Sequence, residues 1–298
     1  MIYGISGIRR ASVATVVSLT AGAVIAGGAL GSTAQAAVAT PTIAAKGGFV
    51  MNNGTAKSLY AKAADTRRAT GSTTKIMTAK VVLEQKNLNL DSKVTIQKAY
   101  SDYIVAKGAS SARLIVGDKV TVRQLLYGLM LPSGCDAAYA LADKFGSGTT
   151  RAARTKSFIA KMNASAKSLG LKNTHFDSFD GISNGSNYST PRDLTKIASS
   201  AMKNSTFRTV VKTKSTTQKV VTKSGGARNM AWTNTNKMLS SYSGAIGVKT
   251  GSGSVAKYCL VFAATRNGKT IIGAVLASTS ETTRTSDMKK IIDYGFKK

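Results

Sequence analysis

The sequence predicts a mixed α/β domain of the α+β type, in which an antiparallel sheet flanked by helices adjoins a mostly helical region. Strand-like runs occupy the first part of the chain and return in the last part, and helical periodicity dominates between them. Two chain ends that both supply strands build one sheet, with the intervening helices set against it. We expect the sheet region at about 37–85 and 205–298 and the helical region at about 86–204.

The first elements expected are a β-hairpin and a buried helix. Residues 48–51 and 58–60 are typical of strands, and an Asn-Asn-Gly turn at 52–54 joins them. A helical pattern begins at Thr73, and its apolar residues recur on more than one face. A helix that is apolar nearly all round is a buried helix.

Helices are expected through the middle of the chain. One ends at Pro132, a second begins at Cys135, and a third begins at Pro191 after the cap candidates Ser189 and Thr190. Proline suits the first turn of a helix because its missing N–H has no partner there. These signals predict one helix end and two helix starts.

The last third of the chain returns to strands. Runs at 245–248, 258–262 and 271–276 are apolar, and an Asn-Gly pair at 267–268 predicts a hairpin turn between the second and third runs. A Gly-rich turn is expected after the first run. A closing helix follows from apolar residues at helical spacing, and Ser286 is well placed to be its N-cap.

Composition narrows the classes of function. Lys and Arg number 42 against 13 acidic residues, so the formal net charge is +29. One histidine and two cysteines are too few for a Cys/His zinc site or a disulfide scaffold, and we expect no metal and no cofactor. The basic residues are spread without clustered aromatics, which argues against nucleic acid. Anionic membrane lipids or wall polymers are the expected charged partners.

The N-terminus resembles a secretory signal peptide. Arg9 and Arg10 precede an uncharged run at 11–30, and Ala-Gln-Ala ends at residue 36. A retained membrane anchor is the alternative, because the run is about as long as a bilayer-spanning helix. We expect residues 1–36 to be cleaved and residues 37–298 to form a single exported domain, which the motifs below identify as catalytic, in the cell wall or at the outer face of the cytoplasmic membrane. The export route, Sec or twin-arginine, stays open.

A lysine is the candidate general base. A histidine-based triad would have to use His175, the only histidine. The chain has no Gly-x-Ser-x-Gly elbow to present a serine to it, so we expect His175 to be structural. Ser-x-x-Lys places a hydroxyl and an amine on one helix face, close enough to share a proton. The pattern occurs at 72–75, 200–203 and 286–289, and only Ser72 opens a helix that reads as buried, where Lys75 can be desolvated.

Two further motifs follow Ser72 and Lys75 in a fixed order. Ser133 and Cys135 flank a glycine in a tight turn, and Lys249 opens a Lys-Thr-Gly sequence that occurs once. The ordered set Ser-x-x-Lys, Ser-Gly-x and Lys-Thr-Gly is the signature of penicillin-recognising serine enzymes. We therefore expect an acyl-transfer site built on these segments.

These motifs resemble those of the low-molecular-weight penicillin-binding proteins, the serine D-alanyl-D-alanine carboxypeptidases and transpeptidases, over the whole mature chain. Segments 71–78, 131–138 and 189–194 are similar to the family's nucleophile helix, second motif and Ser-Thr-Ala-Arg-Asp segment. The second motif normally ends in Asn, and here it ends in Cys135. That variant is similar to DD-transpeptidases of the family, which implies weak hydrolysis and preferred transfer to an amine. The implied fold is serine β-lactamase/DD-peptidase-like, with fewer residues after the third motif than a further β-domain would need.

The resemblance also implies the chemistry of the site. Ser72 would attack the carbonyl of the penultimate D-Ala, with Lys75 as general base, and Ser133 would pass a proton to the leaving amine. The backbone N–H groups of Ser72 and Ser252 would form the oxyanion hole. The substrate-binding residues implied are Cys135, Lys249, Thr250, Gly251 and Ser252. Lys249 and Thr250 would receive the terminal carboxylate.

The implied partners are a peptidoglycan stem peptide ending in D-Ala-D-Ala, an acceptor amine, and β-lactams as covalent inhibitors. The implied role is in cell-wall synthesis and cell shape, for a protein that is expected to be a monomer. Cys135 and Cys259 could form a disulfide in an exported protein, but one belongs to the turn and the other lies mid-strand, so we expect two free thiols.

Two alternatives compete with this interpretation. A class A-like β-lactamase shares the ordered motifs, but that class deacylates through a glutamate, and no glutamate lies between Ser133 and Lys249. A non-catalytic basic protein that binds cell wall or membrane would explain the charge but leaves the three motifs to chance. The Ser72→Ala variant separates a binding protein from an enzyme.

Overall fold

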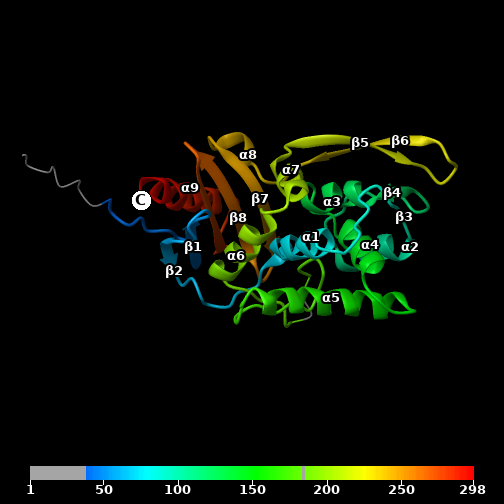
Figure 1. Cartoon of the computed structure of the whole chain (residues 1–298), viewed down its shortest axis with the longest axis horizontal. Coiled ribbons are helices and arrows are strands. Elements are labelled where there is room, and N and C mark those ends of the chain that lie inside the picture. Colours follow the sequence, from blue (N-terminus) through cyan, green and yellow to red (C-terminus); the bar gives the residue numbers. More distant parts are fainter. Residues whose placement is uncertain (1–37, 183–184) are drawn as a thin grey trace, which may run out of the picture. The chain divides into compact units, whose positions relative to one another are not determined.

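The computed structural model describes residues 38–182 and 185–298, and the predicted signal peptide lies outside the described residues. Residues from Val38 onward form one compact unit. Its elements are labelled in Figure 1. In chain order they are β1 (Gly47–Asn52), β2 (Ser58–Lys62), η1 (Gly71–Thr74), α1 (Lys75–Leu83), β3 (Lys93–Thr95), α2 (Lys98–Lys107), β4 (Lys119–Thr121), α3 (Val122–Met130), α4 (Cys135–Phe145), α5 (Arg151–Ser168), α6 (Pro191–Ala201), α7 (Ser205–Lys212), β5 (Ser215–Val221), β6 (Ala227–Thr233), α8 (Met238–Ser241), β7 (Ala245–Gly253), β8 (Lys257–Arg266), β9 (Lys269–Ser278) and α9 (Glu281–Lys297).

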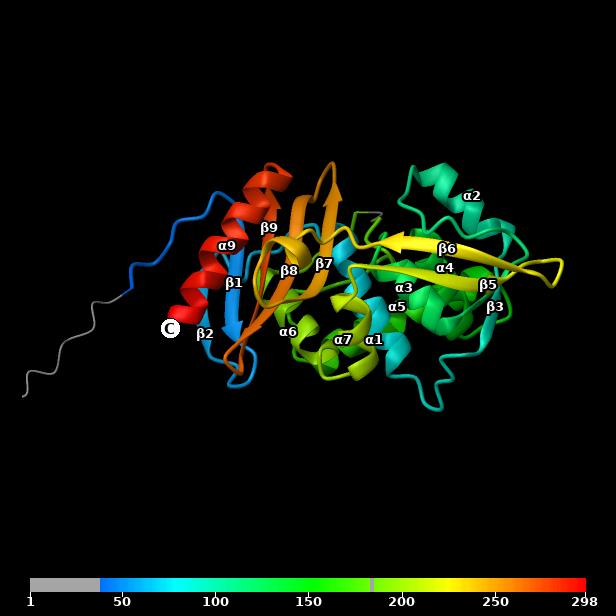
Figure 2. The same cartoon turned by 90° about the horizontal axis from the view of Figure 1, so that it is seen from above.

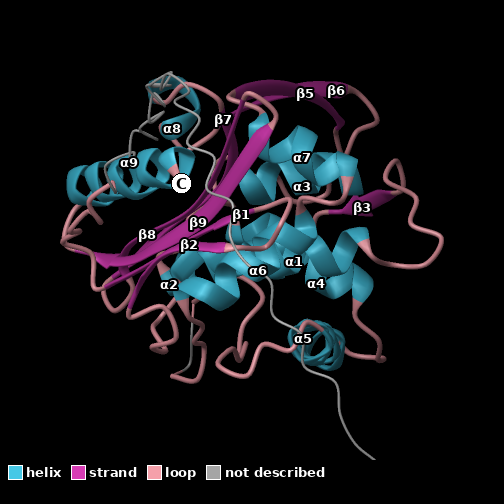
Figure 3. Cartoon of the chain, turned by 60° about the vertical axis from the view of Figure 1, so that its left-hand side comes forward, coloured by secondary structure: helices cyan, strands magenta, loops and turns pink. Residues whose placement is uncertain are grey.

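Both ends of the chain build one five-stranded sheet, which confirms the predicted fold class. The strand order is β2-β1-β9-β8-β7, and every neighbouring pair is antiparallel. Helix α9 covers one face of this sheet, and α6 and α1 lie at the other (Figures 2 and 3). Alternation along β1 explains the two layers, because Val50 packs into the core under α9 whereas Phe49 and Met51 join the core shared with the helices. The strand order leaves β7 at one edge of the sheet.

Helix α1 is the buried helix that the sequence predicts. Its residues from Lys75 to Val82 are all buried, so no face of it meets solvent. The predicted start at Thr73 lies within the 3-10 turn η1, which leads into α1 at Lys75. Helices α3, α4 and α6 end or begin where Pro132, Cys135 and Pro191 predicted, and the Thr190 hydroxyl accepts the N–H of Asp193 as the α6 cap.

A second sheet, of order β3-β4-β5-β6, is absent from the sequence prediction. Strands β3 and β4 are only three residues each, and the outer face of β5 is polar and exposed, so neither gives a strong pattern. The inner face is anchored by Trp232, whose indole N–H donates to the Ala112 carbonyl at 2.8 Å. The long β5–β6 hairpin is the yellow arch in Figure 1.

Two local predictions near the end of the chain are wrong. Ser286 lies inside α9, and the helix is capped instead by Ser280, whose hydroxyl accepts the N–H of Thr283. The Gly-rich segment after residue 248 is not a turn but the continuation of β7, which pairs with β8 as far as Gly253. The Asn267-Gly268 hairpin turn is confirmed, since both residues have positive φ values of 48° and 74°.

No helix within residues 38–182 and 185–298 is long and apolar enough to cross a membrane.

Candidate active site

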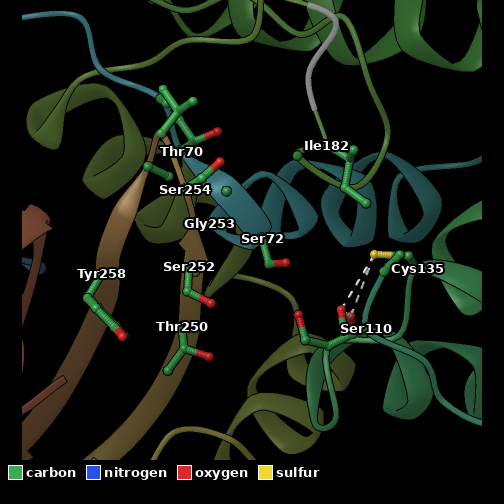
Figure 4. Close-up of a pocket in the computed structure, with 18 of the residues that line it drawn as sticks. Thr70, Ser72, Ser110, Cys135, Ile182, Thr250, Ser252, Gly253, Ser254 and Tyr258 are labelled. Atoms are coloured by element: carbon green, nitrogen blue, oxygen red, sulfur yellow. Dashed lines mark hydrogen bonds between the residues drawn. The ribbon is translucent and has the colours of Figure 1, made fainter. Parts of the chain in front are cut away.

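A cavity of about 880 Å³ brings the three predicted motifs together. Figure 4 shows Ser72 between two walls, with Thr250 and Ser252 of β7 on one side and Ser110 and Cys135 on the other. The edge position of β7 leaves its outer side open to a ligand, because no further strand among the described residues pairs with it there. Ser133 and Gly251 also line the cavity.

Ser72 and Lys75 form a hydrogen-bonded pair at the start of α1. The Lys75 ammonium Nζ donates to Ser72 Oγ at 2.8 Å and is buried, with 0% of the residue exposed. It also donates to the Asp180 carbonyl at 3.1 Å and contacts Cys135 Sγ at 3.2 Å. The pair exists because the 3-10 turn places the hydroxyl and the amine on one face, three residues apart.

Gly71 allows this turn to pack directly on β7. Its φ of +49° lies in the left-handed region, and a Cβ there would meet the carbonyl oxygen of Ser252 at 3.0 Å. The nucleophile candidate and the strand are therefore held backbone to backbone. This contact brings the peptide groups of Ser72 and Ser252 to the same part of the cavity.

Ser133 stands on a strained turn between α3 and α4. Its φ of 66° is unusual for a residue with a side chain, and the Ser110 hydroxyl donates to its carbonyl at 2.6 Å. The Ser133 hydroxyl is buried and has no hydrogen-bond partner among the described residues. Strain and an unpaired hydroxyl cluster at functional sites, so both features agree with a role for Ser133.

Cys135 begins α4 directly behind this turn. Burial raises the pKa of its thiol from 9.0, and the neighbouring Lys75 charge opposes that rise. Asp136 fixes the adjacent wall, because its carboxylate accepts from the N–H of Ala112 at 2.8 Å and the hydroxyl of Ser111 at 2.7 Å. Cys135 and Cys259 are both free and buried, which confirms the expectation of two free thiols.

Lys249 lies beneath the cavity rather than in its wall. Only 1% of the residue is exposed, and Nζ donates to the Thr250 carbonyl at 3.0 Å. Burial and the charge of Lys75 hold the pKa of Lys249 well below its usual 10.5. Thr250 does face the cavity, and its hydroxyl bonds that of Thr235 at 2.7 Å.

Sequence reasoning missed Arg284, a further cation of the site beside Lys75 and Lys249. Arg284 lines the cavity, is only 5% exposed, and pairs with Glu281 at 3.4 Å. Its Nε has no hydrogen-bond partner within the described part of the chain. No signal in the sequence pointed to it, because the helix start was predicted at Ser286. The observed start at Glu281 puts Arg284 in the first turns of α9, where the helix dipole disfavours a cation.

The other candidate motifs lie outside the cavity. Neither Ser200 nor Ser286 lines it. His175 pairs with Tyr188 through both backbone groups, at 2.9 and 3.0 Å, and its ring lies against the Tyr188 ring. No group of three or more metal-ligating side chains occurs in the ranges that the structure describes.

Comparisons with known proteins agree with this arrangement. The family model of D-alanyl-D-alanine carboxypeptidases matches residues 34–280. The D-alanyl-D-alanine carboxypeptidase of Streptomyces sp. strain K15 is 74% identical over 97% of this chain and 99% of its own length. The crystal structure of the Streptomyces K15 DD-transpeptidase covers 88% of this chain and all of its own, at 78% identity and a TM-score of 0.87.

A more distant relative is also similar over most of this chain. The D-alanyl-D-alanine carboxypeptidase DacF of Bacillus subtilis is 31% identical over 85% of this chain, which spans 62% of that relative's length. The chain therefore belongs to the D-alanyl-D-alanine carboxypeptidase family and is a serine enzyme of the carboxypeptidase and DD-transpeptidase type.

Proposed function

We propose that Ser72 is the nucleophile that carries the acyl group of a peptidoglycan stem peptide ending in D-Ala-D-Ala. The observation that supports this role most directly is the 2.8 Å bond between Ser72 Oγ and the buried Lys75 Nζ. An amine at that distance can remove the serine proton once it is itself neutral. The histidine that would be the alternative base lies outside the cavity.

The reaction then runs in two steps. Ser72 Oγ bonds to the carbonyl carbon of the penultimate D-Ala while its proton passes to Lys75, and the C–N bond to the terminal D-Ala breaks. Ser133 relays a proton to the departing amine, a role that its unpaired buried hydroxyl supports. In the second step the acyl group passes from Ser72 to an acceptor amine, giving a cross-link, or to water, giving the free acid.

The backbone N–H groups of Ser72 and Ser252 form the proposed oxyanion hole. The close packing of Gly71 against the Ser252 backbone supports this pairing, because it brings two peptide groups to one place. Such fixed donors stabilise the negative charge that develops on the carbonyl oxygen.

Thr250, Lys249 and Arg284 make up the proposed receptor for the terminal carboxylate. Thr250 offers a hydroxyl in the wall, Arg284 offers a guanidinium with an unpaired Nε, and Lys249 supplies a positive charge from below. Gly251 allows the substrate backbone to approach the β7 edge, where a side chain would be in the way. Burial of the cations strengthens their attraction for a carboxylate.

Cys135 occupies the place where the family's second motif normally has an amide. A thiol is a weak donor and a weak acceptor, so it binds a peptide backbone poorly. Its 3.2 Å contact with Lys75 supports a position beside the proposed general base instead. Reduced affinity for small peptides, with transfer to an amine favoured over hydrolysis, is the consequence that we propose.

The same proposal includes penicillins, which would acylate Ser72 and so inhibit the enzyme covalently. No glutamate lies between Ser133 and Lys249 to activate a deacylating water, and the glutamate that lines the cavity, Glu281, is paired with Lys237 and Arg284. The penicilloyl-enzyme should therefore hydrolyse slowly, unlike that of a class A β-lactamase. Multiple turnover of penicillin G by the pure protein would contradict this assignment.

The cellular setting is proposed from the sequence. Residues 1–36 act as a signal peptide for export, and the mature protein works as a monomer on the cell wall, with a role in cell shape. Removal of residues 1–36 takes away Arg9 and Arg10 and no acid, so the net charge falls from +29 to +27, which favours contact with anionic wall polymers or membrane lipids. A purely binding role leaves the Ser72–Lys75 pair without a purpose.

The test is turnover of a donor peptide ending in D-Ala-D-Ala, with glycylglycine as the acceptor. Release of D-Ala and formation of the transfer product are measured together by mass spectrometry. We expect Ser72→Ala to abolish both, and Ser200→Ala, from the second Ser-x-x-Lys sequence, to leave both near the wild-type level. Full turnover by Ser72→Ala would refute the assignment of the nucleophile.

A further inference from the structure

Glu281 is an acid in the wall of a cavity whose other charged groups are cations. Among the described residues that line the cavity it is the only acid, and it lies in the first turn of α9, directly after the Ser280 cap. The other charged residues of that wall are Lys107 and Arg284, and Lys249 lies beneath it. An acid beside a receptor for a carboxylate repels the group that the receptor binds. The proposed mechanism gives Glu281 no part.

One oxygen of Glu281 is shared between two cations. Its Oε1 lies 3.4 Å from Arg284 Nη2 and 3.3 Å from Lys237 Nζ. Hydrogen bonds between a charged nitrogen and a carboxylate are usually about 2.7–2.9 Å long, so neither cation holds this carboxylate tightly. The Glu281 side chain is 44% exposed, which leaves it room to turn toward either cation.

The two cations differ in how much they need a counter-charge. Arg284 is 5% exposed, and its Nε has no hydrogen-bond partner within residues 38–182 and 185–298. Burial lowers the pKa of Arg284, and the charge of Glu281 opposes that change. The Lys237 side chain is 78% exposed, so water already compensates its charge. Glu281 is therefore a counter-ion that Arg284 needs and Lys237 does not.

We propose that Glu281 competes with the terminal carboxylate of the substrate for Arg284, and that Lys237 receives Glu281 when the substrate displaces it. The proposal rests on the proposed function, which places Arg284 in the carboxylate receptor. Binding then exchanges one carboxylate at Arg284 for another, so the buried guanidinium stays compensated before and after. Glu281 thereby sets how tightly the receptor holds a carboxylate, and it is a specificity-determining residue that acts through Arg284.

The exchange also suits the release of the first product. Departing D-Ala carries its carboxylate away from Arg284, and Glu281 takes the place of that carboxylate. Attack by an amine is the reverse of the departure of an amine, so the acceptor uses the region that D-Ala leaves. A receptor that held the carboxylate more tightly would retain D-Ala there and favour the reverse reaction.

The experiment measures kcat/KM for two donor peptides, one ending in D-Ala-D-Ala with a free carboxylate and the other carrying a C-terminal amide. The ratio of the two values reports on the carboxylate receptor and does not depend on the amount of active protein. Glu281→Gln keeps the shape of the side chain and removes its charge. We expect the ratio to rise about three- to fivefold, a gain in selectivity that simple loss of structure does not produce.

Lys237→Gln is the complementary variant, with Lys289→Gln as its matched control. Without Lys237, Glu281 turns to Arg284 and competes more strongly, so the ratio should fall about threefold. Lys289 is an exposed lysine on α9, the helix that carries Glu281. Its replacement removes the same charge from the protein and should leave the ratio at the wild-type value.

A double variant tests whether the effect passes through Arg284. In Arg284→Gln the ratio is expected to be low, and adding Glu281→Gln should not raise it, because the group for which Glu281 competes is gone. An equal rise in both backgrounds would show that Glu281 acts through its general field, and this would overturn the competition.

The remaining outcomes are also decisive. An unchanged or lower ratio in Glu281→Gln overturns the proposal, since Glu281 would then only support Arg284. If Glu281→Gln does not fold, Lys237→Gln decides alone: a lower ratio supports the competition, and a wild-type ratio overturns it. Absence of D-Ala release from the free-carboxylate donor by the wild-type protein would instead refute the proposed function itself.

Discussion

Replacing Lys249 by methionine should stabilise the fold while it destroys peptide turnover. Lys249 is 1% exposed, and within the described residues its Nζ donates one hydrogen bond, to the Thr250 carbonyl at 3.0 Å. Its charge also lies near the charge of Lys75, which together with burial lowers its pKa well below 10.5. A folded state that depresses the pKa of a lysine is destabilised wherever that lysine is charged in the unfolded chain.

The expected magnitude follows from that burial. Replacing even a buried ion pair by apolar groups of similar volume is often neutral or stabilises a protein by about 1–4 kcal/mol, and methionine matches the length and flexibility of lysine. We expect about 2 kcal/mol for Lys249→Met, equivalent to about 4–8 °C in Tm for a domain of this size. The advantage should be largest at neutral and lower pH. It should shrink as the pH approaches 10.5, the ordinary pKa, because the unfolded lysine then loses its charge too.

Urea unfolding, followed by the fluorescence of the single tryptophan, Trp232, measures this difference. The same preparations are assayed for D-Ala release, where Lys249→Met should lose about 100-fold or more because the carboxylate receptor has lost a charge. Lys219→Met, an exposed lysine on β5, is the matched control and should change neither quantity. A Lys249→Met protein that is less stable than wild type at neutral pH would show that the ammonium is well accommodated, and would refute the reasoning.

Three further predictions concern neighbouring groups. Iodoacetamide should alkylate Cys135 much more slowly than a free thiol at neutral pH and faster as the pH rises, because burial raises the pKa of the Cys135 thiol from 9.0. Penicillin binding should be lost in parallel with the modification of Cys135, measured by mass. Equal reactivity of Cys135 and Cys259 would contradict the placement of Cys135 at the cavity. Gly181→Ala should cost about 2 kcal/mol or more in urea unfolding, because a Cβ at this φ of +95° would overlap the Gly71 carbonyl; a wild-type transition midpoint would contradict it. Arg284→Gln should slow turnover of a donor peptide with a free C-terminal carboxylate about 100-fold. Turnover of the same peptide with a C-terminal amide should fall far less. An equal loss on both peptides would show that Arg284 is not part of the carboxylate receptor.

The elements that the sequence predicted well are those whose local signals agree with their tertiary setting. The buried helix after Ser72, the Pro191 helix start and the Asn267-Gly268 turn each carry a pattern that packing reinforces. The second sheet carries no such pattern, because β3 and β4 are short and β5 presents polar residues to solvent. Its strands are defined by pairing across the fold, which a linear pattern does not contain.

The residues of the candidate site also fall into those that a sequence pattern predicts and those that only the fold reveals. Ser72, Ser133 and Lys249 are found through ordered motifs, which place three distant segments at one cavity. Arg284 belongs to no motif of that set, and its place in the cavity depends on burial and on neighbours that only the folded chain supplies. The cap of α9 was misplaced at Ser286 because two serines, at 280 and 286, both precede helix-forming sequence.

The central claim, that Ser72 is acylated with the help of Lys75, is tested most directly by intact-mass measurement. The mature protein and its Ser72→Ala variant are incubated with penicillin G, and the masses are compared before and after. The account predicts one stable adduct on the wild-type protein, none on Ser72→Ala, and an unchanged adduct on the Ser200→Ala control. No adduct on the wild type, or an adduct of equal yield on Ser72→Ala, would contradict it.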